Sequence, residues 1–210
     1  MVYFYDLIAA DSSDVYWIAV GRNKEENDLL IKHGYRELNY LWFHVDKYAS
    51  AHIYVKLHTK QQSASDLPRD VLNACMQLCK SESVQGNKLA QCDIVSTPWH
   101  NLRKAGYMKP GEVAFKSTKA IVKLQCAGRD NKLLNQLRKR RVDLYEDVEA
   151  LLREAKRSKD GEFFTQYITA HRERLLEEEK QRTSAKRRGK RQGGSDELSP
   201  EEVSLQPASS

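Results

Sequence analysis

The sequence predicts an α+β fold in which a mixed or antiparallel sheet packs against helices, followed by a charged helical extension and a disordered tail. Two observations predict this class. Short β-branched and aromatic runs, separated by turn residues and helical patterns, occupy the chain up to about residue 126. Beyond residue 130 the pattern becomes charged and helical, and the final segment is rich in Gly, Ser, Pro and Glu. We therefore predict a globular domain over 1–128, a helical extension over 129–182 and a disordered, basic-then-acidic tail over 183–210.

The first predicted elements are a β-hairpin and a short helix. Val2–Leu7 and Val15–Val20 are β-branched and aromatic, and Asp11–Asp14 between them has the composition of a turn. Asn23–Lys32 then follows a helical pattern with its apolar side chains on one side, and Gly34 ends it.

A second hairpin follows from the alternation of side chains in Leu41–Asp46 and Ala51–His58. In a hairpin, the apolar side chains of the two runs share one face only when the residue numbers of each opposed pair add up to an even number. The shortest such hairpin pairs Phe43 with Ile53 and closes through Lys47–Ala49. One face then belongs to the core, and the opposite face carries aromatic, imidazole and lysine side chains.

Three further elements are predicted before the extension. Pro68–Cys79 has a single apolar stripe and favours a helix, and Cys92–Val95 favours a short strand. A third hairpin is predicted from Glu112–Phe115 and Ala120–Leu124, which flank a short polar turn.

The extension predicts two helical segments. Apolar residues at a seven-residue spacing over 134–151 favour a helix, but the run is too short for a long coiled coil. A weaker helical pattern covers about 163–181. Two basic clusters in the extension and tail can bind phosphates or serve as a nuclear localisation signal. They are Arg138, Lys139, Arg140 and Arg141, and Lys186, Arg187, Arg188, Lys190 and Arg191.

The formal charge of +6 favours an anionic partner, with nucleic acid first. Because no apolar run approaches about 18 residues, we expect no membrane span, and the first residues lack the basic region of a secretory signal. The four cysteines fit reduced thiols better than a disulfide framework. We expect a cytoplasmic location, with the nucleus as a second compartment, and no cofactor.

Several multi-residue blocks resemble a known family. They are Asn27–Gly34, Leu41–Lys47, Ser50–Val55, Ser83–Lys88 and Thr97–Lys104. In this order they are similar to the NFACT-R domain, and within that family to the stand-alone branch of coiled-coil domain-containing protein 25. The resemblance implies an α+β RNA-binding module related to the C-terminal domain of ribosome quality-control factors, with rRNA, tRNA or the ribosome as its target.

Our hypothesis from the sequence is a non-catalytic RNA-binding protein. Single-stranded RNA is typically held by bases stacked on aromatic or imidazole rings, with Lys and Arg on the phosphates. The second hairpin and the loop after Thr97 supply these side chain types. The residues expected to contact RNA are Trp42, His44, Lys47, His52, Tyr54, Lys56, Trp99, Asn101, Arg103 and Lys104.

The same residues leave other hypotheses open. His44 and His52 could act as a general acid and base in RNA cleavage. With His58 and Asp46 they could bind Zn or Mn, although no tight ligand spacing supports a metal site and we expect none. A helix could also cover this face, which would make the histidines core residues. The segment 163–176 could instead dock on a protein partner, with DNA as the anion.

Overall fold

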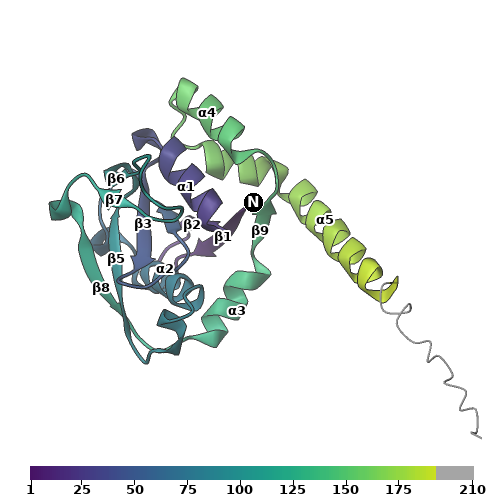
Figure 1. Ribbon diagram of the computed structural model, residues 1–210, viewed down its shortest axis with the longest axis horizontal. Coiled ribbons are helices and arrows are strands. Elements are labelled where there is room, and N and C mark those ends of the chain that lie inside the picture. Colours follow the sequence, from purple (N-terminus) through teal and green to yellow (C-terminus); the bar gives the residue numbers. More distant parts are fainter. Residues whose placement is uncertain (193–210) are drawn as a thin grey trace, which may run out of the picture. The chain divides into compact units, whose positions relative to one another are not determined.

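A computed structural model of the chain describes residues 1–192, with side chains up to Arg188 (Figure 1). The chain divides into two compact units, of which the first is Met1–Arg172 and the second begins at Glu173. The first unit holds one large sheet with helices packed on it, so the predicted α+β class is confirmed. The predicted disorder of 193–210 and the side chains of Lys190 and Arg191 lie outside the described residues. Within residues 1–192, no helix is both long and apolar enough to cross a membrane.

An antiparallel seven-stranded sheet with the order β8-β5-β3-β4-β2-β1-β9 forms the centre of the first unit. Its strands are β1 (Val2–Ile8), β2 (Val15–Gly21), β3 (Tyr40–Val45), β4 (Ile53–Lys56), β5 (Cys92–Pro98), β8 (Val122–Cys126) and β9 (Val142–Leu144). A separate two-stranded sheet pairs β6 (Leu102–Arg103) with β7 (Ala114–Phe115). The helices are α1 (Lys24–His33), α2 (Arg69–Ser81), α3 (Asn131–Lys139), α4 (Val148–Ser158) and α5 (Phe163–Gln192).

The first two predicted hairpins and the helix between them are confirmed. β1 and β2 pair over their full length. In the β3–β4 hairpin, Phe43 lies opposite Ile53 as predicted, and the ladder ends at this pair. The α1 helix begins where the Asn23 side chain accepts a hydrogen bond from the backbone N–H of Glu26, which satisfies one free donor of the first turn.

The third predicted hairpin, between 112–115 and 120–124, is wrong. Strand β7 pairs with β6, and β8 instead extends the large sheet beside β5. Alternation shows which side chains of a strand are buried, but it does not show which strand lies beside it. The same pattern therefore fits a hairpin partner and a distant strand.

The apolar pattern over 134–151 does not form one helix. Strand β9 separates α3 from α4 and pairs with β1 at the edge of the sheet. Val142 and Leu144 are fully buried there. The predicted boundary at residue 128 therefore falls inside the first unit, because the sheet takes an edge strand from beyond that residue.

The α5 helix corrects two further expectations. It continues to Gln192, so residues 183–192 are helical where disorder was predicted. Its first turns bury Phe164 and Ile168, and the Phe164 ring centroid lies 5.3 Å from that of Phe4 in β1. The start of the 163–176 segment therefore completes this chain's own core, and these apolar side chains are not presented to a partner protein.

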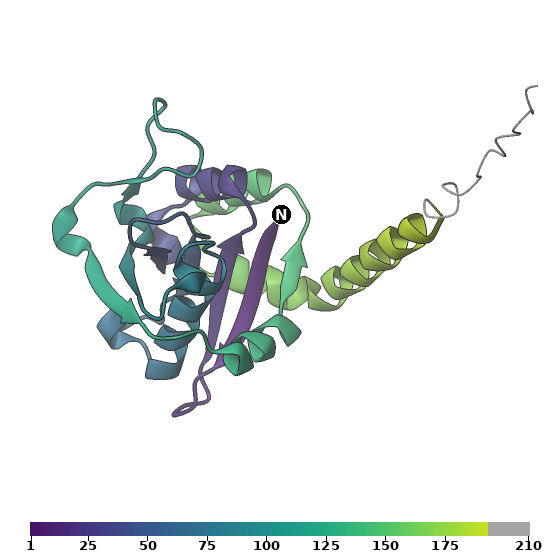
Figure 2. The same cartoon turned by 60° about the horizontal axis from the view of Figure 1, so that its bottom comes forward.

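Both faces of the sheet are covered (Figures 1 and 2). On one face, Leu41, Phe43 and Val55 belong to an apolar cluster completed by side chains of α2 and α3. The opposite face packs against the turn at Trp99 and the first turns of α5, while α1 contacts β2 and α4. As a result, every residue of β4 is buried.

A buried carboxylate joins the edge of the sheet to two helical segments. Asp6 of β1 is 6% exposed and accepts hydrogen bonds from Arg140, at the end of α3, and from Arg172 of α5. Burial disfavours the charged carboxylate, but the hydrogen bonds from the two guanidinium groups outweigh it and lower the pKa of Asp6. Asp6 is therefore ionised and paired at neutral pH.

We expect Asp6→Asn to lower the free energy of unfolding by about 2 kcal/mol at pH 7, because it removes two charge-assisted hydrogen bonds. The folded pKa of Asp6 is depressed, so this stability is present above the unfolded pKa of about 3.9 and is lost as the pH falls further. Urea unfolding at neutral and acidic pH measures both effects, with exposed Asp11→Asn as control. A difference between wild type and variant that persists at low pH would contradict this assignment.

Candidate nucleic-acid interface

The aromatic face of the β3–β4 hairpin, expected to contact RNA, lies inside the protein. Trp42 and His52 are each 1% exposed, and Tyr54 is 0% exposed. The ring centroid of Trp99 lies 4.4 Å from that of Tyr54, and the centroid of Phe115 in β7 lies 5.8 Å from that of Trp42. Bases cannot stack on rings without accessible surface, so the prediction that this face is open is wrong. Alternation shows which side chains share a face, but not what covers them.

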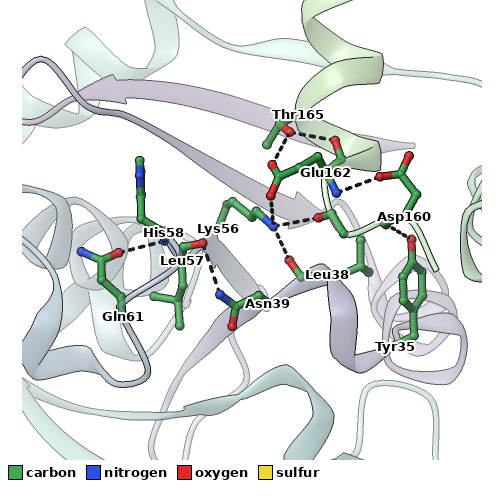
Figure 3. A network of polar contacts seen from close by, with 11 residues as sticks. Tyr35, Leu38, Asn39, Lys56, Leu57, His58, Gln61, Asp160, Glu162 and Thr165 are labelled. Atoms are coloured by element: carbon green, nitrogen blue, oxygen red, sulfur yellow. Dashed lines mark hydrogen bonds and ion pairs between the residues drawn. The ribbon is translucent and has the colours of Figure 1, made fainter.

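Lys56 is also a structural residue. Its side chain is buried, and its Nζ donates to the carbonyl oxygens of Leu38 at 2.8 Å and Gly161 at 2.7 Å. The same Nζ forms an ion pair with Glu162 at 2.8 Å (Figure 3). A Cβ at Gly161 would lie 2.5 Å from the carbonyl oxygen of Glu37, so the chain can approach this closely only with glycine. Lys56 thus holds the segment before α5 against the sheet.

Three residues of the 99–104 segment hold the fold together rather than face solvent. Trp99 is 3% exposed. Asn101 is buried, and its side chain donates to Thr97 Oγ1 and to the carbonyl oxygen of Ser117, both at 2.8 Å. Lys104 forms an ion pair with Asp28 at 2.7 Å. Of the ten predicted contact residues, only Lys47 and Arg103 are exposed, and His44 and Lys104 are half-buried.

Two of the predicted histidines line a groove of about 1020 Å³, which we call the histidine groove. Its walls come from the β3–β4 hairpin with its loop, the turn between β2 and α1, and the segment 108–115. The His44 imidazole lies parallel to the Trp42 indole, with centroids 5.5 Å apart, and the His52 ring meets His44 edge-on at 5.0 Å. Lys47 lies in the same wall.

Both imidazoles are neutral at physiological pH. Burial lowers the pKa of His44, and burial together with the neighbouring His44 lowers the pKa of His52 to about 3. General acid–base cleavage uses one protonated imidazole beside a neutral one, whereas burial favours the neutral form of both rings here. Within the described part of the chain, no group of three or more His, Cys, Asp or Glu side chains could hold a metal ion.

A second groove, of about 1090 Å³, is lined by five exposed cations, and we call it the basic groove. Two of its carboxylates are already engaged, because Asp28 pairs with Lys104 and Glu149 pairs with Arg153. Glu25 lies 3.9 Å from Lys24. The exposed cations that line the groove are Lys32, Arg36, Arg103, Lys116 and Lys156.

Sequence reasoning identified only Arg103 among these five cations. Lys32 and Arg36 flank the end of α1, and Lys156 belongs to α4, more than a hundred residues later. The one available signal was that Lys32 lies in a block that resembles the family. The others are isolated charges in the sequence, and only the packing of α1 against α4 brings them to one groove.

Some residues of the two basic clusters form contacts within the fold, and others are exposed. Arg140 pairs with Asp6, and Arg141 pairs with Asp143 at 2.6 Å, so these two act within the fold. Arg138 donates to Asn135 within α3. Lys139 is exposed at the end of α3, and exposed positions on α5 hold Lys186, Arg187 and Arg188.

The fold and the two grooves define an α+β module whose rim carries the cations typical of a nucleic-acid-binding surface. The model of the family described as the NFACT protein RNA binding domain matches residues 1–117, and the chain belongs to this family. The chain is 55% identical to Protein JLP2 of Saccharomyces cerevisiae over 91% of its own length and 92% of that protein. It is 39% identical to Coiled-coil domain-containing protein 25 of Bos taurus, over 70% and 69% respectively.

One solved structure is similar to part of the chain. It is the C-terminal part of the fibronectin/fibrinogen-binding protein from Streptococcus suis, at 18% identity and a TM-score of 0.49. The match covers 64% of this chain and 48% of that chain. The resemblance identified in the sequence is therefore confirmed by the family match and by the curated relatives.

We expect the free energy of unfolding to fall by about 2 kcal/mol between pH 7 and pH 5 because of His52. Its folded pKa is depressed, so its stabilising effect is full above the unfolded pKa of about 6.5 and is lost as the pH falls toward the folded pKa of about 3. His52→Gln should remove this slope, and exposed His100→Gln should keep most of it. Parallel pH curves for wild type and His52→Gln would contradict the burial of a neutral imidazole.

We expect Lys56→Met to destabilise the protein by about 3 kcal/mol or more, because it leaves Glu162 and two backbone carbonyls without their shared donor. Urea unfolding followed by tryptophan fluorescence measures the change. Lys60→Met, at an exposed position four residues later, is the matched control and should stay within about 0.5 kcal/mol of wild type. Equal stability of the two variants would show that Lys56 does not anchor the segment before α5.

Proposed function

We propose that this protein is a non-catalytic RNA-binding module that holds the RNA backbone in the basic groove. The observation that carries the proposal is the set of five exposed cations around one groove in which Asp28 and Glu149 are already paired with Lys104 and Arg153. Lys and Arg side chains that neutralise phosphates release counterions, and this release is the main source of sequence-independent affinity for nucleic acid. Membership of a family of RNA-binding domains supports RNA as the polyanion.

The cations reach the groove from separate, rigid elements. Arg36 follows α1, Arg103 belongs to β6, and Lys156 belongs to α4. The Lys116 Nζ donates to the carbonyl oxygen of His100 at 2.6 Å, which fixes its position beside the groove. Because these elements pack on one another, the spacing of the charges is set before RNA binds, and less conformational entropy is lost on binding.

The proposed target is rRNA or tRNA, in association with the ribosome, and the proposed location is the cytoplasm. The resemblance of the sequence to the C-terminal domain of ribosome quality-control factors supports this target. The exposed Lys186, Arg187 and Arg188 of α5 would add affinity that does not depend on the sequence of the RNA.

We expect Arg36→Gln with Arg103→Gln to weaken RNA binding about ten-fold or more near physiological salt. The slope of log K against log salt should become shallower by about 1.5 to 2, since two phosphate contacts are lost. Fluorescence anisotropy with labelled tRNA, titrated between about 50 and 200 mM salt, measures both quantities. Lys60→Gln with Lys132→Gln removes two exposed cations outside the groove and serves as control.

An unchanged salt slope in the double variant would show that RNA does not use the basic groove. Absence of wild-type binding to tRNA and rRNA at low salt would remove the proposed function. If the wild type bound duplex DNA of the same length with equal affinity, the proposed ligand would be nucleic acid in general and not RNA in particular. Cleavage of labelled RNA by the wild type, lost in His44→Ala, would favour the enzymatic hypothesis.

A further inference from the structure

The histidine groove has a chemical character that phosphate binding does not explain. Its wall contains three buried side chains with polar atoms that have no hydrogen-bond partner, namely Asn27 Oδ1, Trp42 Nε1 and His52 Nδ1. These residues are 5%, 1% and 1% exposed. Buried polar atoms in native proteins are almost always paired. Five other buried polar atoms of the described residues also lack a partner, but three gather in the wall of this one groove, and this gathering points to a partner that binds there.

The three atoms offer a mixed set of hydrogen-bonding groups. The Trp42 indole N–H can only donate, and the Asn27 amide oxygen can only accept. The His52 imidazole is neutral, and its Nδ1 donates or accepts according to the tautomer. A ligand that satisfies this wall needs an acceptor and a donor on one edge. The edge of a nucleobase has this arrangement.

Flat rings border the same groove. The His44 imidazole is stacked on Trp42 with an angle of 8° between the planes, and its remaining surface lines the groove. The half-buried Phe115 ring lines it as well. The three polar atoms are themselves buried, so a base reaches them only after the His44 and Phe115 rings move aside. Each ring then offers a surface for stacking, which is how proteins hold unpaired bases.

The charge and the volume of the histidine groove suit a nucleotide better than a neutral metabolite. The exposed cations that line the groove are Arg22, Lys24, Lys47, Lys109 and Lys123, of which Lys123 pairs with Asp46 and Lys24 lies 3.9 Å from Glu25. The volume of about 1020 Å³ slightly exceeds the roughly 300–1,000 Å³ typical of small-molecule sites, which leaves room for one nucleotide with its phosphates. Met108 lines both the histidine groove and the basic groove, so one strand could occupy the two in succession.

We propose that the histidine groove binds one unpaired nucleobase of an RNA whose backbone lies in the basic groove. The inference rests on the proposed function, and it adds selectivity for unpaired RNA. The base stacks on His44 and Phe115, and its edge pairs with Asn27, Trp42 and His52. A base within a duplex cannot enter, because its edge is already paired and its faces are covered by its neighbours.

The test compares one RNA of about 20 nucleotides as a single strand and annealed to its complement. Wild type should bind the single strand about ten-fold or more tightly than the duplex. His44→Ala and Phe115→Ala should lose this preference while duplex affinity and the salt slope stay unchanged. Phe115→Leu keeps an apolar side chain without the ring and should behave like Phe115→Ala. Tyr107→Ala, at an 81% exposed aromatic that lines neither groove, is the control.

A 2-aminopurine base placed in the single strand reports stacking directly, since its fluorescence falls when it stacks on a ring. Equal wild-type affinity for single strand and duplex would overturn the inference, as would variants that weaken both alike. An unchanged salt slope in the variant with Arg36→Gln and Arg103→Gln, with the single-strand preference intact, would remove only the backbone assignment. Free mononucleotides that bind as tightly as the RNA would make this a nucleotide site and overturn the RNA assignment.

Discussion

Burial of strands β3 and β4 on both faces is the constraint on which the rest of the structure depends. Within these strands His44 alone is not buried. Every other polar group there must find its partners inside the protein, because an unpaired buried group costs about 1–3 kcal/mol. Lys56 meets this requirement with two carbonyl oxygens and Glu162. Trp42 Nε1 and the hydroxyls of Tyr40 and Tyr54 do not meet it with protein groups, and of these three residues only Trp42 lines the histidine groove.

The contacts of Lys56 explain why the helical extension belongs to the same unit as the sheet. Lys56 holds the segment before α5, and the Tyr35 hydroxyl donates to the carbonyl oxygen of Asp160 at 2.6 Å in the same place (Figure 3). From there Phe164 enters the core beside β1, and Arg172 reaches the buried carboxylate of Asp6. The paired cations Lys56 and Arg172 therefore stabilise the fold, whereas exposed cations at the groove rims remain available to a polyanion.

The elements that cover the sheet also create the surfaces proposed to bind RNA. The segment between β6 and β7 closes over the aromatic face, and its residue Met108 lines both grooves. One groove offers exposed cations, and the other offers rings and unpaired hydrogen-bonding groups. The basic groove would then supply affinity for the RNA backbone, and the histidine groove would supply selectivity for unpaired bases. Because the two grooves are adjacent but separate, either property can change without loss of the other.

The sequence by itself determined the α+β class, the family, the first hairpin and the pairing of Phe43 with Ile53, because side-chain alternation and multi-residue blocks are local properties. The sequence also identified His44 and His52 as neighbours, but it did not show that they are largely buried. Only the tertiary structure decided that β9 completes the sheet, that β7 and β8 have different partners, and that Arg36 and Lys156 meet at one groove. The reason is physical: periodicity specifies which side chains turn inward, whereas the neighbour that covers them is chosen by packing between distant segments.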